Sequence, residues 1–353
     1  MKKRGLDRLL IALGLALCIT GIFIALSGEN PLNAYYQLIK GALWGRSNLI
    51  TTLRWSVPYL IASIAAAVSF KAGVFNLGIE GCVYLGGLTA ALIGAYFQGL
   101  PPLIHISLAI FGAMVVSALW LSIPAYLKAY HNVNEVITTW MFTYIAILLC
   151  QYLVRNIFFD PTDIGSAAQQ VRTPYIMEAA KLKQLFPPYQ LNFSIFIGIT
   201  LMIIFYIFIK KTRSGYDLSM LGTCPNFAKY GGINIEKTQF YAILVSGSIG
   251  GILGACEVLG VHHRYIHGFS NDLATLGIMV ALMGRLNPVS MAIAALFMGI
   301  MQNGARAMSR VTNVSLDTVL IMIALVVILI SAEEFFEIFK IRQRVKQSKK
   351  GES

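Results

Sequence analysis

The chain has 353 residues, of which 57% are hydrophobic and only 12% are charged. Soluble domains carry about 25% charged residues, so this composition excludes a soluble enzyme, a disordered chain and a disulfide-rich scaffold. The formal net charge of +12 does not indicate nucleic-acid binding, because the basic residues lie at the chain ends and in short loops rather than on one continuous face. The composition is that of a polytopic membrane protein.

Apolar runs long enough to suggest membrane spans recur along the whole chain, since a spanning helix needs roughly 20 apolar residues. They lie at residues 9–26, 50–70, 77–97, 103–121, 136–154, 193–209, 240–259, 273–283, 289–308 and 316–330. The first run is interpreted as a span rather than a cleaved signal peptide, because further apolar runs follow it. The eighth is short, so it is tilted, broken or extended into its polar flanks. The sequence predicts an all-α transmembrane bundle of about ten spans.

Basic residues set the orientation, because Lys and Arg concentrate in cytoplasmic segments. With a cytoplasmic N-terminus, 18 of the 28 Lys and Arg residues fall inside. These are Lys2, Lys3, Arg4, Arg8, Lys71, Lys128, Lys210, Lys211, Arg213, Lys229, Lys237, Arg285, Lys340, Arg342, Arg344, Lys346, Lys349 and Lys350. An even number of spans also returns the C-terminus to the cytoplasm. We therefore predict one transmembrane domain over residues 1–340 and a basic cytoplasmic tail over 341–353.

Two connections between the predicted spans are long. Residues 155–192 fall outside, and their stretch 175–185 is predicted as a short surface helix. Residues 210–238 fall inside. Within this inner loop Pro225 can begin a short helix, which Gly231 and Gly232 can end. Its apolar residues have basic flanks, so the helix either lies on lipid or docks to a cytoplasmic partner.

Polar residues interrupt the apolar runs at two places. Residues 72–81 contain three glycines with Asn76 and Glu80, and irregular backbone at membrane depth needs protein or water around it. These two side chains either cap a tight helical hairpin or line the permeation path. In residues 132–141, Asn134 is a fair N-cap, while Thr138 and Thr139 face either a helix interface or a translocation route.

The sequence contains none of the common motifs for ATP binding, hydrolysis or metal binding. No Gly–Lys dipeptide occurs, so the chain has no phosphate-binding P-loop of its own. Neither HExxH nor GxSxG occurs, and no carboxylate pair suggests acid/base catalysis. His262, His263 and His267 match no standard metal pattern, and the five cysteines form no CxxC pair. We expect no catalytic residue, metal or cofactor here. Glu257 is either buried and functional or placed at the membrane interface.

Four motifs occur in order: AGVFNLGIEG (72–81), NEVITTWMFTYIA (134–146), LGTCPNFAKYGGI (221–233) and GFSNDLATLGIMVALMGRLNP (268–288). Together they resemble the permease subunits of ABC importers of the nucleoside and simple-sugar type, which are related to ribose and branched-chain amino-acid permeases. The resemblance covers roughly residues 10–335. Cys82 stands where the family often has Gln, and Cys224 and Phe227 make the third motif atypical.

The resemblance implies two ABC ATPase subunits that bind ATP and Mg, a second permease subunit, alike or different, and an external binding lipoprotein or periplasmic protein, in a bacterial inner membrane. By motif position, the element that couples to the ATPase would be Leu218–Ile233. Its expected contact residues are Leu218, Leu221, Gly222, Pro225, Asn226, Phe227, Ala228, Tyr230, Gly232 and Ile233.

The predicted function is inward movement of nucleosides, with pentose or hexose import as the alternative. Aromatic stacking and a few hydrogen-bonding groups suit a nucleoside path, so the candidate path residues are Phe75, Asn76, Glu80 and Thr138. An ion-coupled secondary transporter is a further alternative, since such proteins need intramembrane carboxylates. Its candidate residues would be Glu80, Glu257, Asp272 and Asp317.

Overall fold

The computed structural model describes residues 14–160 except 16, residues 171–312, and positions 314, 315, 318, 320, 321, 324 and 325. These residues are helical apart from connecting segments, two isolated β-bridges and one 3₁₀ turn (Glu178–Ala180). The α-helices are α2 (Pro31–Leu43), α3 (Arg46–Lys71), α4 (Ile79–Tyr96), α5 (Pro102–His131), α6 (Glu135–Asn156), α7 (Ser194–Lys211), α8 (Arg213–Thr223), α9 (Pro225–Tyr230), α10 (Ile235–Glu257), α11 (Leu273–Met283) and α12 (Pro288–Val311).

Seven helices of the described residues are long and apolar enough to cross a membrane: α3, α4, α5, α6, α7, α12, and α10 with the π-helical turn Val258–His262 that continues it. Each coincides with a predicted apolar run. Of the first predicted run, Leu17–Leu26 is a shorter apolar helix. Ten of the fifteen residues of the tenth run, 316–330, and the whole tail 341–353 lie outside the described residues.

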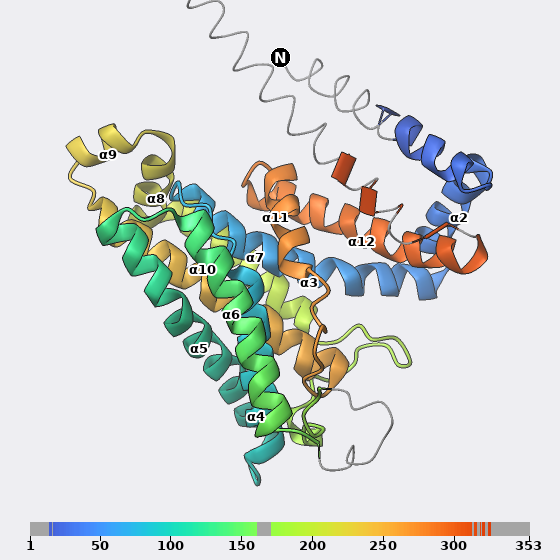
Figure 1. The fold of residues 1–353 in the computed structure, drawn as a ribbon, viewed down its shortest axis with the longest axis horizontal. Helices are drawn as coiled ribbons and strands as arrows, with labels where there is room; N and C mark the ends of the chain where they lie inside the picture. Colours follow the sequence, from blue (N-terminus) through green and yellow to red (C-terminus); the bar gives the residue numbers. More distant parts are fainter. Residues whose placement is uncertain are drawn as a thin grey trace, which may run out of the picture. The chain divides into compact units, whose positions relative to one another are not determined.

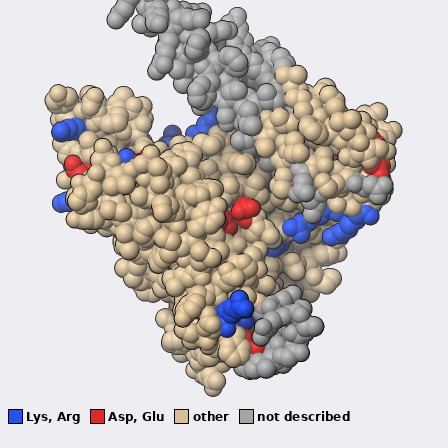
Figure 2. Space-filling view, in the orientation of Figure 1, with Lys and Arg blue, Asp and Glu red and all other residues tan. Residues whose placement is uncertain are grey.

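The described chain forms two compact units: residues 53–298, and residues 1–52 with 299–353. In the first, α4, α5, α6 and α10 run side by side (Figure 1). Backbones approach closely here, since a Cβ on Gly86 would lie 2.5 Å from the Cα of Gly251. Small residues allow such contacts between transmembrane helices. The outward faces of α5 and α6 are largely apolar. In the view of Figure 2, few charged side chains lie on the surface that these two helices turn toward the reader.

The second unit contains α2, which the sequence analysis did not predict. Its start is marked by Asn30, whose side chain accepts a hydrogen bond from the Leu32 amide, and by Pro31 in the first turn, both typical of a helix N-terminus. In the same unit the buried Asn303 amide donates to the Gly41 carbonyl at 3.2 Å and to the Thr52 hydroxyl at 3.0 Å. We missed α2 because it is amphipathic and too short to span a membrane.

Helix ends follow their capping residues. Asn134 is the N-cap of α6, as predicted, and its side chain accepts from the Val136 amide at 3.0 Å. By contrast, the helix predicted over residues 175–185 is wrong except for one 3₁₀ turn. Backbone amides of this stretch bond elsewhere, for example Ile176 to the His263 carbonyl and Leu182 to the Leu259 carbonyl, both at 2.9 Å. Such long-range pairing replaces the local pattern of a helix.

Candidate functional site

Between α3 and α4 the chain is irregular, as the glycines of residues 72–81 predict, and it runs inside unit 53–298. Asn76 is fully buried there. Its amide donates to the Ser246 hydroxyl at 3.0 Å, and its carbonyl oxygen accepts from the Gly78 amide at 2.8 Å. Asn76 therefore fixes the entry into α4 and ties it to α10.

Two threonines of α6 bond the backbone amide and carbonyl of Leu77 in this segment. The Leu77 amide donates to the Thr139 hydroxyl at 3.0 Å, and the Thr143 hydroxyl donates to the Leu77 carbonyl at 3.1 Å. Both threonines are buried. Irregular backbone at membrane depth requires such partners. Thr139 and Thr143 are four positions apart and so share one helix face, a spacing the sequence analysis did not use.

Thr138, one of the predicted path residues, has a different environment. It is half-buried, and its hydroxyl donates to the carbonyls of Asn134 and Glu135 at 3.1 and 3.3 Å, within its own helix turn. Phe75, another predicted path residue, is 38% exposed and stacks on Phe70 with 4.2 Å between ring centroids. A role for either residue in the path remains a prediction.

Glu80 lies in the first turn of α4 and is buried. Its Oε2 accepts a hydrogen bond from the Ala274 amide at 2.8 Å. Ala274 is the second residue of α11, and the first amides of a helix have no partner within the helix. A carboxylate at this end also suits the helix dipole. Glu80 on α4 therefore caps the start of α11. From the sequence alone, a cap of the tight hairpin around residues 72–81 was instead one alternative.

With 11 residues, α11 is about 16 Å long, roughly half of a bilayer's hydrocarbon core. Its predicted bounds, 273–283, are confirmed. It does not extend into its polar flanks: Asn271 and Asp272 before it, and Arg285 and Leu286 after it, have positive φ angles of 44° to 60°. The eighth apolar run is therefore a short helix that left-handed residues end on both sides.

An ion pair that the sequence analysis did not foresee joins α3 to α10. Arg54 Nη2 lies 2.9 Å from Glu257 Oε2, and each side chain is 7% exposed. The Arg54 guanidinium also lies over the Trp55 ring, 4.1 Å from its centroid. Of the two placements open for Glu257, the structure shows the buried one. A buried charge in a membrane protein is expected to be paired in this way.

The predicted coupling loop contains two helices, α8 and α9, separated at Cys224. As predicted, α9 begins at Pro225 and ends before Gly231 and Gly232. Leu218, Leu221 and Ala228 are buried, whereas Phe227 is 62% and Tyr230 92% exposed. Pro225, Asn226, Gly222 and Gly232 are also exposed, and Ile233 is half-buried. The exposed aromatic pair, not Leu221, is therefore available to a partner.

Gly222 seats α8 on the end of α3. A Cβ on Gly222 would overlap the Lys71 carbonyl oxygen and lie 2.9 Å from its carbon, with the Gly73 nitrogen at 3.1 Å. Only a glycine fits such an approach. The predicted coupling loop thus touches the start of the segment that leads to Asn76 and Glu80.

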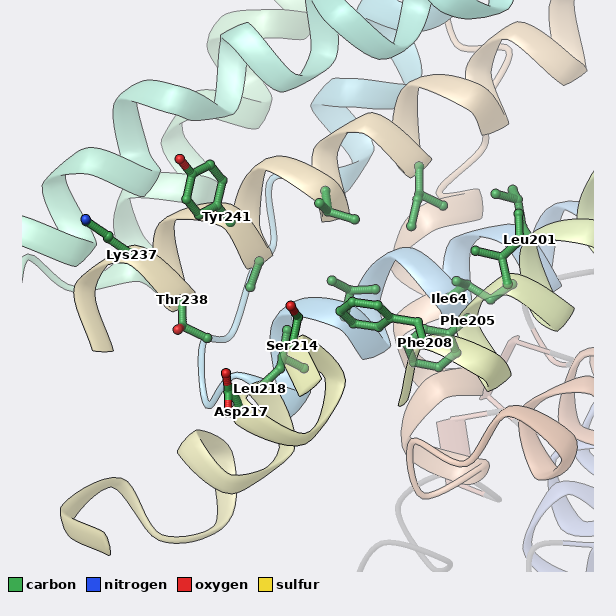
Figure 3. A pocket seen from close by; sticks show the side chains of 15 residues that line it. Ile64, Leu201, Phe205, Phe208, Ser214, Asp217, Leu218, Lys237, Thr238 and Tyr241 are labelled. Carbon is green, nitrogen blue, oxygen red and sulfur yellow. The ribbon is translucent and has the colours of Figure 1, made fainter. Parts of the chain in front are cut away.

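A pocket of about 430 Å³ opens between α3, α7, α8 and α10 (Figure 3). Its walls are mainly aliphatic and aromatic, and Ser214, Asp217, Lys237 and Thr238 gather at one end. The four predicted path residues are not among those that line it.

Comparison with known proteins gives the family. Residues 48–330 match the family described as branched-chain amino acid transport system, permease component. The chain is 30% identical to a guanosine ABC transporter permease protein of Bacillus subtilis, covering 92% of each chain. It is 27% identical to a glucose ABC transporter permease protein of Haloferax volcanii (92% of this chain, 87% of the relative). A nucleoside ABC transporter permease protein of Lactococcus lactis is 26% identical (93% and 91%). The chain therefore belongs to this family of ABC transporter permease components, and it is a multi-pass membrane protein and a transport subunit.

Proposed function

We propose that this chain is the membrane-spanning subunit of an ATP-driven importer that moves nucleosides inward. The observation that carries the proposal is its similarity, over more than nine tenths of its length, to permeases named for guanosine and for nucleosides in two different bacteria. Import of a simple sugar is the second candidate, because the glucose ABC transporter permease protein of Haloferax volcanii matches a similar share of this chain, 92%.

The proposed topology has ten spans with both termini in the cytoplasm of a bacterium. Seven long apolar helices and the shorter Leu17–Leu26 support it, and α11, too short to cross a bilayer alone, marks the position of the eighth span. The distribution of Lys and Arg residues supports the orientation. In this topology the α8–α9 loop faces the cytoplasm, and the segment between α6 and α7 faces outward.

The proposed partners are two ATPase subunits that hold ATP and Mg, a second permease subunit and an external binding protein. The ATPase would seat on Phe227 and Tyr230, because exposed aromatic side chains are typical interface anchors. Movement of α8 would reach the Lys71–Gly73 backbone through Gly222. From there it would pass along the segment of Asn76 to Glu80 and so to α11, whose amide Glu80 holds.

Uptake by the reconstituted complex tests the proposal. The permease is co-expressed with a candidate ATPase, second permease and binding protein from the same organism, and the complex is placed in proteoliposomes. We expect ATP-dependent uptake of labelled guanosine that unlabelled glucose does not compete away. An ATPase that cannot hydrolyse ATP is the control. Uptake of glucose but not guanosine would establish the sugar alternative, and uptake that needs an ion gradient but no ATP would overturn both.

A further inference from the structure

The pocket between α3, α7, α8 and α10 has the form of a groove with an apolar interior and a polar end. Ile64, Leu201 and Phe205 lie at one end, and Asp217, Lys237 and Thr238 lie at the other (Figure 3). Its volume of about 430 Å³ is within the range of small-molecule sites. None of the predicted path or ATPase-contact residues except Leu218 lines it.

Groove depth matches one leaflet of a bilayer. The α10 residues that line it run from Lys237 to Ile249, and twelve residues of helix rise about 18 Å. Half of the hydrocarbon core is about 15 Å. A straight acyl chain that enters at the polar end therefore has apolar wall along its length.

The groove lies beside α7, a helix whose apolar side chains are largely exposed. Within α7 only 17% of the apolar stretch is buried, against 83% of the corresponding stretch of Ile235–His262. Exposed residues of α7 include the bulky Ile199, Ile203 and Ile207. Interfaces between transmembrane helices favour small residues instead. Lipid, rather than a second copy of the chain, is thus the expected neighbour of this face.

Charges at the polar end favour an anionic headgroup. Lys237 extends away from the phenyl rings of the groove, as a lysine does when its ammonium group reaches the membrane interface. Lys210, Lys211 and Arg213 lie at the junction of α7 and α8, and Asp217 and Glu236 are the acidic residues nearby in sequence. Lys237 and Asp217, the two charged residues that line the groove, balance each other, so the net positive charge of this region comes from the three basic residues at the α7–α8 junction. Basic sites between transmembrane helices on such a side bind anionic lipid headgroups.

We propose that this groove binds one anionic phospholipid from the leaflet that meets α8. One acyl chain lies between α7 and α10, the phosphate lies beside Lys237, and the Ser214 and Thr238 hydroxyls donate to the headgroup oxygens. Because α8 supplies Ser214, Asp217 and Leu218 to the wall, the lipid braces α8 against the bundle. That last consequence rests on the proposed coupling role of α8; the binding site itself needs only a chain embedded in a membrane.

Native mass spectrometry of the purified full chain tests the site, with phosphatidylglycerol or phosphatidylcholine added after delipidation. We expect one phosphatidylglycerol to bind at least fivefold more tightly than phosphatidylcholine. Lys237→Ala should weaken it about fivefold, because a basic residue near a lipid surface contributes about 1 kcal/mol. Asp217→Asn should strengthen it by a similar factor, and a folding defect cannot do that. Lys229→Ala, an exposed lysine of α9 outside the groove, is the matched control.

Filling the groove gives a second readout. Val245 lines it and is 47% exposed, so Val245→Trp should prevent retention of the lipid while Ile203→Trp on α7 should not. Equal binding of both lipids in wild type, with no effect of Lys237→Ala, would overturn the proposal. So would a wild-type dimer that Val245→Trp dissociates, since the groove would then be an interface between copies of the chain.

Discussion

Glu80 Oε2 accepts a hydrogen bond at 2.8 Å from the backbone amide of Ala274, 194 residues later in the chain. This bond links the first turn of α4 to the first turn of α11, a helix too short to cross a bilayer. A membrane offers no water to replace the missing partner of that amide. The Glu80 carboxylate therefore stabilises the start of α11, whether or not it also contacts substrate.

Two substitutions of Glu80 distinguish the effect of its hydrogen-bond acceptor from the effect of its charge on stability. Glu80→Ala leaves the Ala274 amide unpaired, so we expect a loss of about 1–3 kcal/mol in the free energy of unfolding. Glu80→Gln keeps an acceptor oxygen and should lose less. A fluorophore that reacts with buried Cys82, Cys150 and Cys256 as they become exposed on heating reports the difference. Equal destabilisation by both variants would contradict the capping role.

Uptake by the same variants addresses the permeation path. We expect Glu80→Gln and Asn76→Ala to lower uptake while membrane abundance stays normal, because Asn76 lies in the irregular segment and Glu80 in the helix turn that follows it, and both polar side chains are buried. Thr138→Val is the comparison, since its hydroxyl bonds its own helix turn. Normal uptake in both Glu80→Gln and Asn76→Ala would leave these residues with packing roles only.

The buried pair of Arg54 and Glu257 should be strongly coupled. Removing one partner leaves an uncompensated buried charge, so Arg54→Met or Glu257→Met alone should cost about 3–5 kcal/mol in the free energy of unfolding. The double variant should recover most of that loss. Glu178→Gln, which breaks the exposed pair with Lys181, is the control and should leave the thermal midpoint unchanged. Additive single effects in the double-mutant cycle would show that the pair contributes little.

How far the sequence predicts this structure depends on the range of each interaction. Long apolar runs predict the spanning helices and the bounds of α11, because these signals are local. α2 is not a membrane span, so the apolar runs do not predict it, although Asn30 and Pro31 mark its start. Contacts such as those of Glu80 with Ala274, and of Arg54 with Glu257, join residues about 200 positions apart. A single sequence contains no local signal of such pairing.

In the predicted coupling loop, Phe227 and Tyr230 are exposed and can contact the ATPase, whereas Leu221 is buried within the chain. We expect Phe227→Ala with Tyr230→Ala to weaken ATPase association by about 2 kcal/mol or more, measured by co-purification, with no change in thermal stability. Leu221 is 1% exposed, so Leu221→Ala should instead cost about 2–5 kcal/mol in the free energy of unfolding. An intact complex with the double aromatic variant would show that the ATPase docks elsewhere.

Native and introduced cysteines test the orientation of the loops. Cys224 is exposed at the break between α8 and α9, so an impermeant thiol reagent should reach it only from the cytoplasm. In a Cys18→Ser, Cys224→Ser background, Lys183→Cys should react from outside whole cells. Leu182→Cys, which is buried, should not react from either side. Reaction of Cys224 in intact cells would invert the proposed topology.

Gly222 offers the sharpest test of how the loop communicates with the bundle. A methyl group there would overlap the Lys71 carbonyl, so Gly222→Ala must lift α8 from the end of α3. Phe227 and Tyr230 lie on α9, beyond the contact, and should still bind the ATPase. We therefore expect a complex that assembles and hydrolyses ATP but imports substrate at least tenfold more slowly. Gly231→Ala is the matched control, because its Cβ would meet atoms no closer than 3.4 Å at an ordinary φ of −75°. Normal import by Gly222→Ala would show that movement of α8 does not pass through the Lys71–Gly73 backbone. Loss of ATPase binding would place the defect at the docking surface instead.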